Sequence, residues 1–231
     1  MRWFFLLVFL LKLDFAWGQT FSYPAIKNDG QSIADFIPGD WTIRDSVSGN
    51  FNDNQGCVII LQSKDSGTIS KEKEGHIQEI KTQPRILIIL FRKSANSLQL
   101  IVQNNNFILT QDEPEMTDPY QSIKIENGVI YFDFTVYYGP SAYSLLTYAF
   151  QFRNREFKLI GADTNYFNEA TRDSQNCSFN FLTKKWNITE DNEESKRRPK
   201  KIWHTIELKE LKTLKNFNQP DTWEVTKGIF L

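Results

Sequence analysis

The feature that most restricts how this chain can fold is a two-residue alternation of apolar and polar side chains, which recurs in one short segment after another. In residues 129–138, the side chains that share one face of an extended backbone are Ile130, Phe132, Phe134, Val136 and Tyr138. In residues 143–152, the corresponding set is Ser144, Leu146, Tyr148, Phe150 and Phe152. Because successive side chains of a strand point to opposite faces, each segment predicts a strand with one buried face.

Short connections link these segments in hairpin order. Asn127-Gly128 separates two of them and is the strongest short turn signal in the chain. The run Arg85–Phe91 is apolar almost throughout, which predicts a strand covered on both faces. The segments that we expect to form strands are 41–47, 57–62, 85–91, 97–103, 122–125, 129–138, 143–152, 156–160, 177–182, 186–189 and 202–206. They predict a mainly β fold of antiparallel sheets, sandwich-like or blade-like, with short helical turns at the periphery.

A few segments depart from the strand pattern. Residues 32–37 predict a single helical turn that starts at Ser32 and stops before Pro38. Residues 63–82 are too polar to pack and predict a long surface excursion. Near the C-terminus, residues 208–217 predict a helical turn or two, and residues 223–231 predict a last edge strand.

The first eighteen residues have the composition of a secretory signal peptide. Arg2 precedes an apolar run over 3–11, and the segment ends in the pattern Ala16-Trp17-Gly18, so we expect cleavage before Gln19. A membrane anchor is the alternative, but this run is far shorter than the roughly 20 residues that cross a hydrocarbon core. We therefore expect a leader over 1–18, followed by one exported, soluble β-rich domain over 19–231 without stable membrane insertion.

The charge of the mature chain is close to balanced. Without the leader, it carries 25 basic and 27 acidic side chains, a net charge of −2. This balance does not favour nucleic acid or an anionic membrane as a partner. The run 195–201 is basic, but the acidic residues within 190–194 directly precede it and nearly cancel it, so we expect a solvated loop there.

Cys57 and Cys177 are the only cysteines, and outside the cytoplasm they could pair with each other in just one way. Such a disulfide would close a long loop and contribute about 4–5 kcal/mol in the chain-entropy model. The alternative is that both are free thiols, since Cys57 begins an apolar run and a free cysteine commonly behaves as a small buried hydrophobe.

The segment 46–61 raises the question of a metal site. Asn50, Asn52 and Asn54 occupy alternate positions with Asp53 between them, the spacing that aims oxygen ligands inward in a calcium loop. Calcium prefers charged oxygens, however, and this loop offers one carboxylate among three amides. Asn residues also tolerate left-handed backbone angles and bond their own main chain. We therefore expect a turn and no cofactor, with calcium as the alternative.

Six segments of the mature chain are distinctive as a set. They are FIPGDW (36–41), SGNFNDNQGCVIIL (48–61), TQPRILIILF (82–91), QNNNFIL (103–109), FKLIGADTNYF (157–167) and SFNFLTKKW (178–186). Together they resemble a family of exported bacterial proteins of uncharacterised function. In that family the loop usually reads like G-D-L-N-x-D-G-x-x-D, similar to FG-GAP or VCBS-type β-blade repeats in which aspartates bind calcium. Asn50 and Asn54 stand where that pattern has aspartates, so the resemblance implies a degenerate metal loop.

Catalytic signatures are scarce. His76 and His204 are the only histidines, the first in the charged excursion and the second in an expected strand. The chain has no G-x-S-x-G elbow, no H-E-x-x-H and no Cys/His cluster with metal-ligand spacing. We expect a non-catalytic protein, and a hydrolase of envelope polymers is the alternative from a different functional class.

Aromatic residues offer a better indication of function. Tyr137, Tyr138 and Tyr143 bracket a Gly-Pro-Ser turn, where tyrosines can supply a rigid, amphipathic contact surface for a protein or a sugar ring. Such residues also simply close the ends of β folds. Asn176 and Asn187 lie in glycosylation patterns, which we expect to stay unmodified in a bacterium. We predict a periplasmic or secreted binding or structural protein with a protein or glycan partner in the cell envelope; a periplasmic inhibitor or immunity-type protein is the runner-up.

Overall fold

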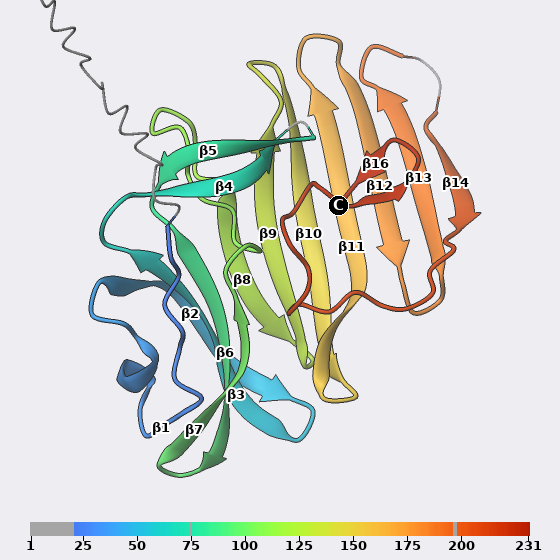
Figure 1. The fold of residues 1–231 in the computed structure, drawn as a ribbon. Coiled ribbons are helices and arrows are strands. Elements are labelled where there is room, and N and C mark those ends of the chain that lie inside the picture. Colours follow the sequence, from blue (N-terminus) through green and yellow to red (C-terminus); the bar gives the residue numbers. More distant parts are fainter. Residues whose placement is uncertain (1–20, 74, 196–197) are drawn as a thin grey trace, which may run out of the picture.

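The computed structural model describes residues 21–73, 75–195 and 198–231, so the expected leader over 1–18 lies outside the described residues. Strands account for 59% of the structure and helix for 2%, and the sheets are antiparallel (Figure 1). The predicted mainly β fold with antiparallel sheets is confirmed. The helical turn η1 (Ile33–Phe36) follows Ser32, as predicted. Within the described ranges, no helix is both long enough and apolar enough to cross a bilayer.

The first large sheet has five strands in the order β1-β7-β6-β3-β2. Their bounds are β1 Asp29–Gly30, β2 Trp41–Phe51, β3 Asn54–Ser63, β6 Arg85–Ser94 and β7 Ser97–Asn104. One face of this sheet packs on the second sheet, and N-terminal residues including Ile26 and Phe36 cover the other. Burial on both faces explains why β6 begins with seven consecutive buried residues, and the prediction for 85–91 is confirmed.

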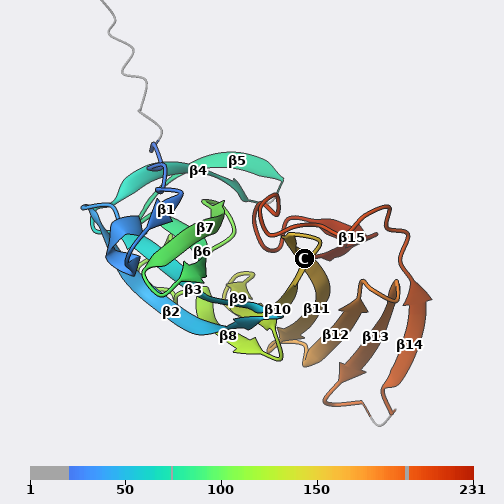
Figure 2. The same ribbon diagram turned by 90° about the horizontal axis from the view of Figure 1, so that it is seen from below.

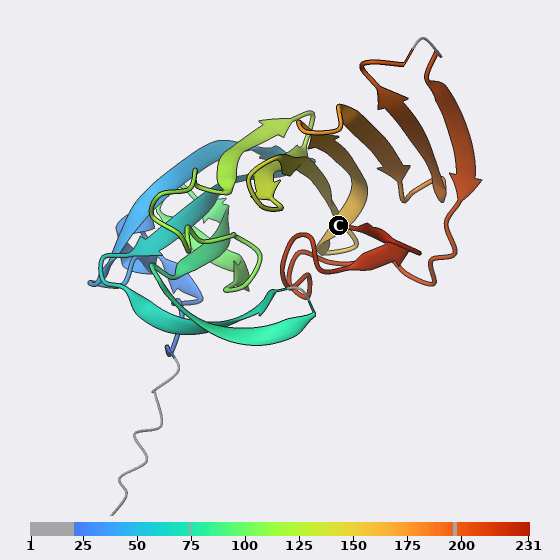
Figure 3. The ribbon, with the colours of Figure 1, turned by 90° about the horizontal axis from the view of Figure 1, so that it is seen from above.

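The second large sheet has seven strands, each paired with the next strand along the chain. Their bounds are β8 Tyr120–Glu126, β9 Val129–Tyr137, β10 Ala142–Arg153, β11 Glu156–Asn168, β12 Asp173–Asn180, β13 Lys185–Asn192 and β14 Lys200–Thr205. At one end, β8 lies beside β2 of the first sheet. At the other end, β12 to β14 extend beyond the five-stranded sheet (Figures 2 and 3).

The two sheets share one core, and Phe107 lies inside it. This residue belongs to the connection between β7 and β8, not to a strand, and it is fully buried. Five aromatic rings lie edge-on to its ring at centroid distances of 5.0–5.7 Å; they belong to Phe132, Phe134, Tyr148, Phe150 and Phe217. The loop therefore fills the space between the sheets.

One expectation about the connecting segments is wrong. The polar excursion over 63–82 contains a hairpin, β4 (Gly67–Lys73) with β5 (His76–Thr82), and buries Ile69. Lys71 of this hairpin donates to Thr110 and Asp112, so the hairpin is held against the loop that follows β7. The excursion packs because its polar residues form hydrogen bonds with the neighbouring loop. Hydrophobic periodicity alone does not indicate such contacts.

The C-terminal segment agrees with the prediction only in part. Residues 208–217 form no helix, but one helical turn is present at 213–217, where the N–H of Phe217 donates to the carbonyl of Thr213 at 2.9 Å. The chain runs across the core, where Leu214 and Phe217 are buried and Thr213 bridges to Lys158 of β11. The predicted last strand is a separate hairpin, β15 (Glu224–Thr226) with β16 (Ile229–Phe230). Its place beside the large sheet reflects aromatic packing, since Trp223 contacts the rings of Phe181 and Phe217.

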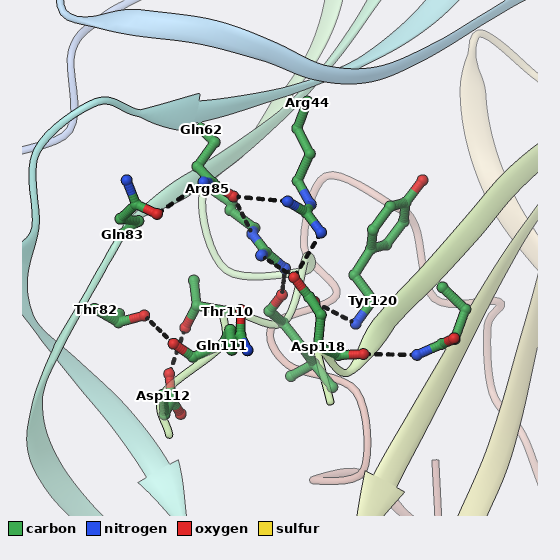
Figure 4. Close-up of polar contacts among 12 residues, drawn as sticks. Arg44, Gln62, Thr82, Gln83, Arg85, Thr110, Gln111, Asp112, Asp118 and Tyr120 are labelled. Carbon is green, nitrogen blue, oxygen red and sulfur yellow. Dashed lines mark hydrogen bonds and ion pairs between the residues drawn. The ribbon is translucent and has the colours of Figure 1, made fainter. Parts of the chain in front are cut away.

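A buried arginine connects the two large sheets near the place where β2 meets β8 (Figure 4). Arg85 of β6 is 3% exposed, and its guanidinium donates to both carboxylate oxygens of Asp118, at 2.9 and 2.5 Å. Arg44 of β2 donates to the same carboxylate at 2.6 Å. Burial alone would raise the pKa of Asp118, but the hydrogen bonds and charge of Arg85 outweigh it and hold this pKa below its ordinary value. We call Arg44, Arg85 and Asp118 the arginine junction.

Candidate functional site

The seven-stranded sheet buries one face against the core and presents the other, here called the outer face, to solvent. On β10, Tyr143, Leu145 and Thr147 point outward and alternate with buried neighbours. Strand pairing aligns outward residues in rows across the sheet, since paired residues lie side by side on the same face. The first row is Tyr137, Tyr143 and Phe167; the second is Leu145, Asn165, Asn176, Thr189 and Lys201; the third is Thr147, Asp163, Ser178 and Asn187.

The first row and Leu145 form an aromatic patch. The ring centroids of Tyr137 and Tyr143 are 6.1 Å apart, and those of Tyr143 and Phe167 are 5.9 Å apart. Tyr137 is 40% exposed and Leu145 is 45% exposed. We call Tyr137, Tyr143, Leu145 and Phe167 the aromatic patch; it offers contiguous apolar surface on a rigid sheet.

Beside the aromatic patch lies an open polar groove of about 270 Å³. It is lined by the third row and by the second row without Leu145, from Thr147 on β10 to Lys201 on β14, and Cys177 lies at its floor. Among the described residues, the amide side chains of Asn165, Asn176 and Asn187 form no hydrogen bond with another protein group. These amides can therefore donate to and accept from a ligand. The aromatic patch and this polar groove together form the outer-face site.

The three predicted tyrosines are not one cluster. Tyr137 and Tyr143 lie in the aromatic patch, whereas Tyr138 lies beside Tyr166 on the opposite face of the sheet. The hydroxyl of Tyr138 donates to the carboxylate of Asp221 at 2.9 Å. The three tyrosines therefore do not form one surface, because consecutive residues of an extended backbone, here Tyr137 and Tyr138, point to opposite faces. Binding through these residues stays a prediction.

Asp221 is a partly buried acid in the C-terminal segment. Burial raises its pKa from 3.8 to about 6, although the hydrogen bond from Tyr138 acts in the opposite direction. Its backbone has a positive φ of 65°, and its N–H donates to the hydroxyl of the fully buried Tyr148. Asp221 therefore helps to hold the C-terminal segment against the inner face of β9 and β10.

We expect the Asp221→Asn variant to be more stable than the wild type at pH 7 by about 1–2 kcal/mol. The folded-state pKa of Asp221 lies above its unfolded value, so ionising this acid destabilises the fold as pH rises from about 4 to about 6. Asparagine keeps an acceptor for Tyr138 and never ionises. Urea unfolding at pH 7 and pH 4 measures the effect; an advantage of equal size at both pH values would show that backbone preference, not charge, explains it.

The predicted turn in the 50–54 segment is formed. Phe51 pairs with Asn54, and Asn52 has a φ of 55°, so Asn52 and Asp53 make the tip of the β2–β3 hairpin. The amide of Asn52 donates to the carbonyl of Phe152 at 2.9 Å, and that of Asn54 donates to the carbonyl of Phe51 at 3.3 Å, while Asn50 pairs with Gln55. Two of the amides considered as metal ligands thus bond the main chain. An open hollow of about 550 Å³ lies between this tip and the β10–β11 turn.

No metal centre is evident in the described part of the chain, where no three His, Cys, Asp or Glu side chains are grouped to hold an ion. His76 and His204 lie far apart in the fold, on β5 and β14. His204 stacks on Trp186 at a centroid distance of 4.5 Å, and neither histidine bonds a described carboxylate.

Cys57 and Cys177 are free and buried, so the disulfide that the sequence left open is not formed. Cys57 lies under the N-terminal cover of the five-stranded sheet, and Cys177 lies in the core between the sheets. Burial raises the pKa of both thiols, that of Cys177 to about 11. Both residues behave as small buried hydrophobes. Of the two glycosylation patterns, Asn176 is exposed in the polar groove, and Asn187 also lines the groove but is largely buried.

Several residues of the outer-face site were not predicted as such. Leu145, Asn165 and Phe167 share the face of Tyr143, but the strand that carries the last two was expected to end at Ile160. It continues to Asn168 because β11 pairs with β10 along its whole length. In the sequence, Asp163, Asn165 and Phe167 alternate with Ala162 and Thr164, which are buried. This alternation is the signal that could have extended the predicted strand beyond Ile160.

Comparison with protein-family models, curated proteins and solved structures finds no match for this chain.

Proposed function

We propose that the protein is an exported, non-catalytic binding protein that recognises a glycan through the outer-face site. The observation that carries this proposal is the juxtaposition of the aromatic patch with unbonded amides in the polar groove. A sugar ring has apolar C–H faces and a rim of hydroxyls, so it needs both a ring surface to stack on and groups that donate and accept hydrogen bonds. The outer-face site supplies both on one rigid sheet.

The shape of the outer-face site favours an extended ligand. The groove crosses strands from Thr147 to Lys201 and is open to solvent along its length. Pockets for small molecules usually enclose most of the ligand and are lined mainly by apolar residues. A chain of sugars that lies along the groove, with one ring on the aromatic patch, fits the polar lining better. Export is supported by the composition of residues 1–18, and we retain membership of the exported bacterial family as a proposal based on the six segments.

The test is binding of the mature protein to a panel of immobilised oligosaccharides and to isolated bacterial cell-wall polymer. We expect saturable binding by the wild type. Tyr143→Ala should weaken it about tenfold, because a lost aromatic contact of about 1.4 kcal/mol corresponds to that factor. Asn165→Ala and Asn176→Ala should also weaken it, because both amides line the polar groove.

Tyr131→Ala is the matched control. Tyr131 lies on the same strand and face as Tyr137 but about 20 Å from it, and it is not among the residues that line the polar groove, so its removal should leave glycan binding unchanged. Equal losses in the Tyr131 and Tyr143 variants, or no binding by the wild type, would overturn the proposal. Release of soluble sugar from the polymer by the wild type would instead identify a hydrolase.

A further inference from the structure

The edge of the seven-stranded sheet at β14 lacks a neighbouring strand among the described residues. The other open edges of the large sheets are shielded: β8 and β2 lie beside each other, and the N-terminal segment runs along β7. All six residues of β14 are exposed, and the strand lies where the sheet extends away from the rest of the molecule (Figure 2). An edge strand of this kind presents unpaired N–H and C=O groups.

Two large apolar side chains lie at the centre of β14. Trp203 is 62% exposed on the outer face, and Ile202 is 46% exposed on the opposite face. Ile202 continues the apolar row that includes Ile188 and buried Cys177. Lysines on an edge strand normally act against aggregation, and the positions of Lys200 and Lys201 fit that role. Protection against aggregation does not explain why a tryptophan is exposed on one face of this edge strand and an isoleucine on the other.

We infer that β14 is a docking edge for an extended segment of another protein, which adds to the sheet as an eighth strand and carries acidic residues opposite Lys200 and Lys201. Main-chain hydrogen bonds supply affinity in this mode, and alternate side chains supply specificity. The inference goes beyond the proposed glycan binding and does not depend on it. In a partner strand that pairs antiparallel with β14, the side chains would follow the order apolar, apolar, acidic, acidic. Its apolar residues would then lie against Trp203 and Ile202.

Charge distinguishes this partner from a second copy of the chain. Two β14 strands paired antiparallel along their whole length would place Lys200 opposite Thr205 and Lys201 opposite His204, so a second copy would bring no carboxylate to either lysine. Glu190, which pairs with Lys200 in the sheet, forms no ion pair with it. Both lysines are therefore available to a partner's carboxylates.

The probe is a synthetic peptide of sequence TTVVEET, with TTVVKKT as its charge-reversed control. Trp203 is the most exposed tryptophan among the described residues, so its fluorescence should shift to the blue as the acidic peptide binds. Lys200→Glu/Lys201→Glu should weaken binding at least about tenfold and should favour the lysine peptide instead. Lys81→Glu, at an exposed lysine of β5, is the control and should leave binding unchanged.

Amide hydrogen exchange distinguishes strand addition from adhesion of the peptide to the surface. Exchange over residues 200–205 should slow in the presence of the acidic peptide. Trp203→Ala should reduce this protection without unfolding the protein, because the side chain is largely exposed. Absence of binding, binding without protection of β14, or a concentration-dependent dimer that Trp203→Ala abolishes would each overturn the inference. Loss of glycan binding in Tyr143→Ala is a separate readout and does not bear on it.

Discussion

Replacing Asp118 with alanine is expected to lower the free energy of unfolding by about 3–5 kcal/mol at pH 7. Arg85 is almost completely buried, and Asp118 is its carboxylate partner through two hydrogen bonds. Without that carboxylate, the guanidinium stays buried with no charge to compensate it. Chemical unfolding of wild type and variant measures the loss, and Asp65→Ala, at an exposed aspartate, should change stability by less than about 0.5 kcal/mol.

A double-mutant cycle makes the Asp118 prediction sharper. Arg85→Met with Asp118→Leu removes both charges and keeps most of the volume, so the double variant should lose much less stability than the sum of the single variants. Because the folded-state pKa of Asp118 is depressed, its contribution is present above its ordinary pKa of 3.8 and should be lost as pH falls through the folded value. Additive losses would show that the arginine junction does not act as a unit.

Phe107→Ala is the second change with a large expected effect, a loss of about 3–5 kcal/mol. The ring is fully buried and makes edge-on contacts with five other aromatic rings, so its removal leaves a cavity that both sheets surround. Phe107→Leu keeps part of the volume and should cost less than half as much. Thermal and urea unfolding measure both variants.

The outcome that contradicts the Phe107 prediction is a loss below about 1 kcal/mol, the size typical of a surface substitution. Such a result would mean that the 105–119 connection is displaced without effect on the core. Asn106→Ala is a suitable control, because it changes the preceding residue of the same loop without removing a ring from the core.

Most of the strands could be predicted because their apolar residues repeat every two positions. The segment 129–138 shows this clearly: Ile130, Phe132 and Phe134 are buried as the alternation requires. The hairpin within 63–82 could not be found in this way, since Ile69 supplies its buried apolar side chain and polar contacts hold the rest, among them those of Lys71 with Thr110, Thr82 with Gln111 and Gln219 with Glu72. The path of 208–217, with a single turn at 213–217, also depends on the core that it covers, because its spacing of leucines suits a longer helix equally well.

The candidate site was only partly predictable. Tyr137 and Tyr143 were identified because aromatic residues near a turn are an informative pattern, but Phe167 reaches them only through the register between β10 and β11. The amides of Asn165 and Asn176 come together from different strands for the same reason. Register is set by pairing and bulges, which a single sequence does not specify. The arginine junction was missed because Arg85 begins an apolar run and Asp118 lies in a loop.

The successive pairing of β8 through β14 has a kinetic consequence. Each strand finds its partner within a few tens of residues, so this half of the molecule has low contact order and should assemble rapidly as a series of hairpins. The five-stranded half needs β3 to meet β6 across the intervening hairpin and needs residues 21–37 to close over it. A chain that folds outward from the β8–β14 meander would complete its N-terminal half last.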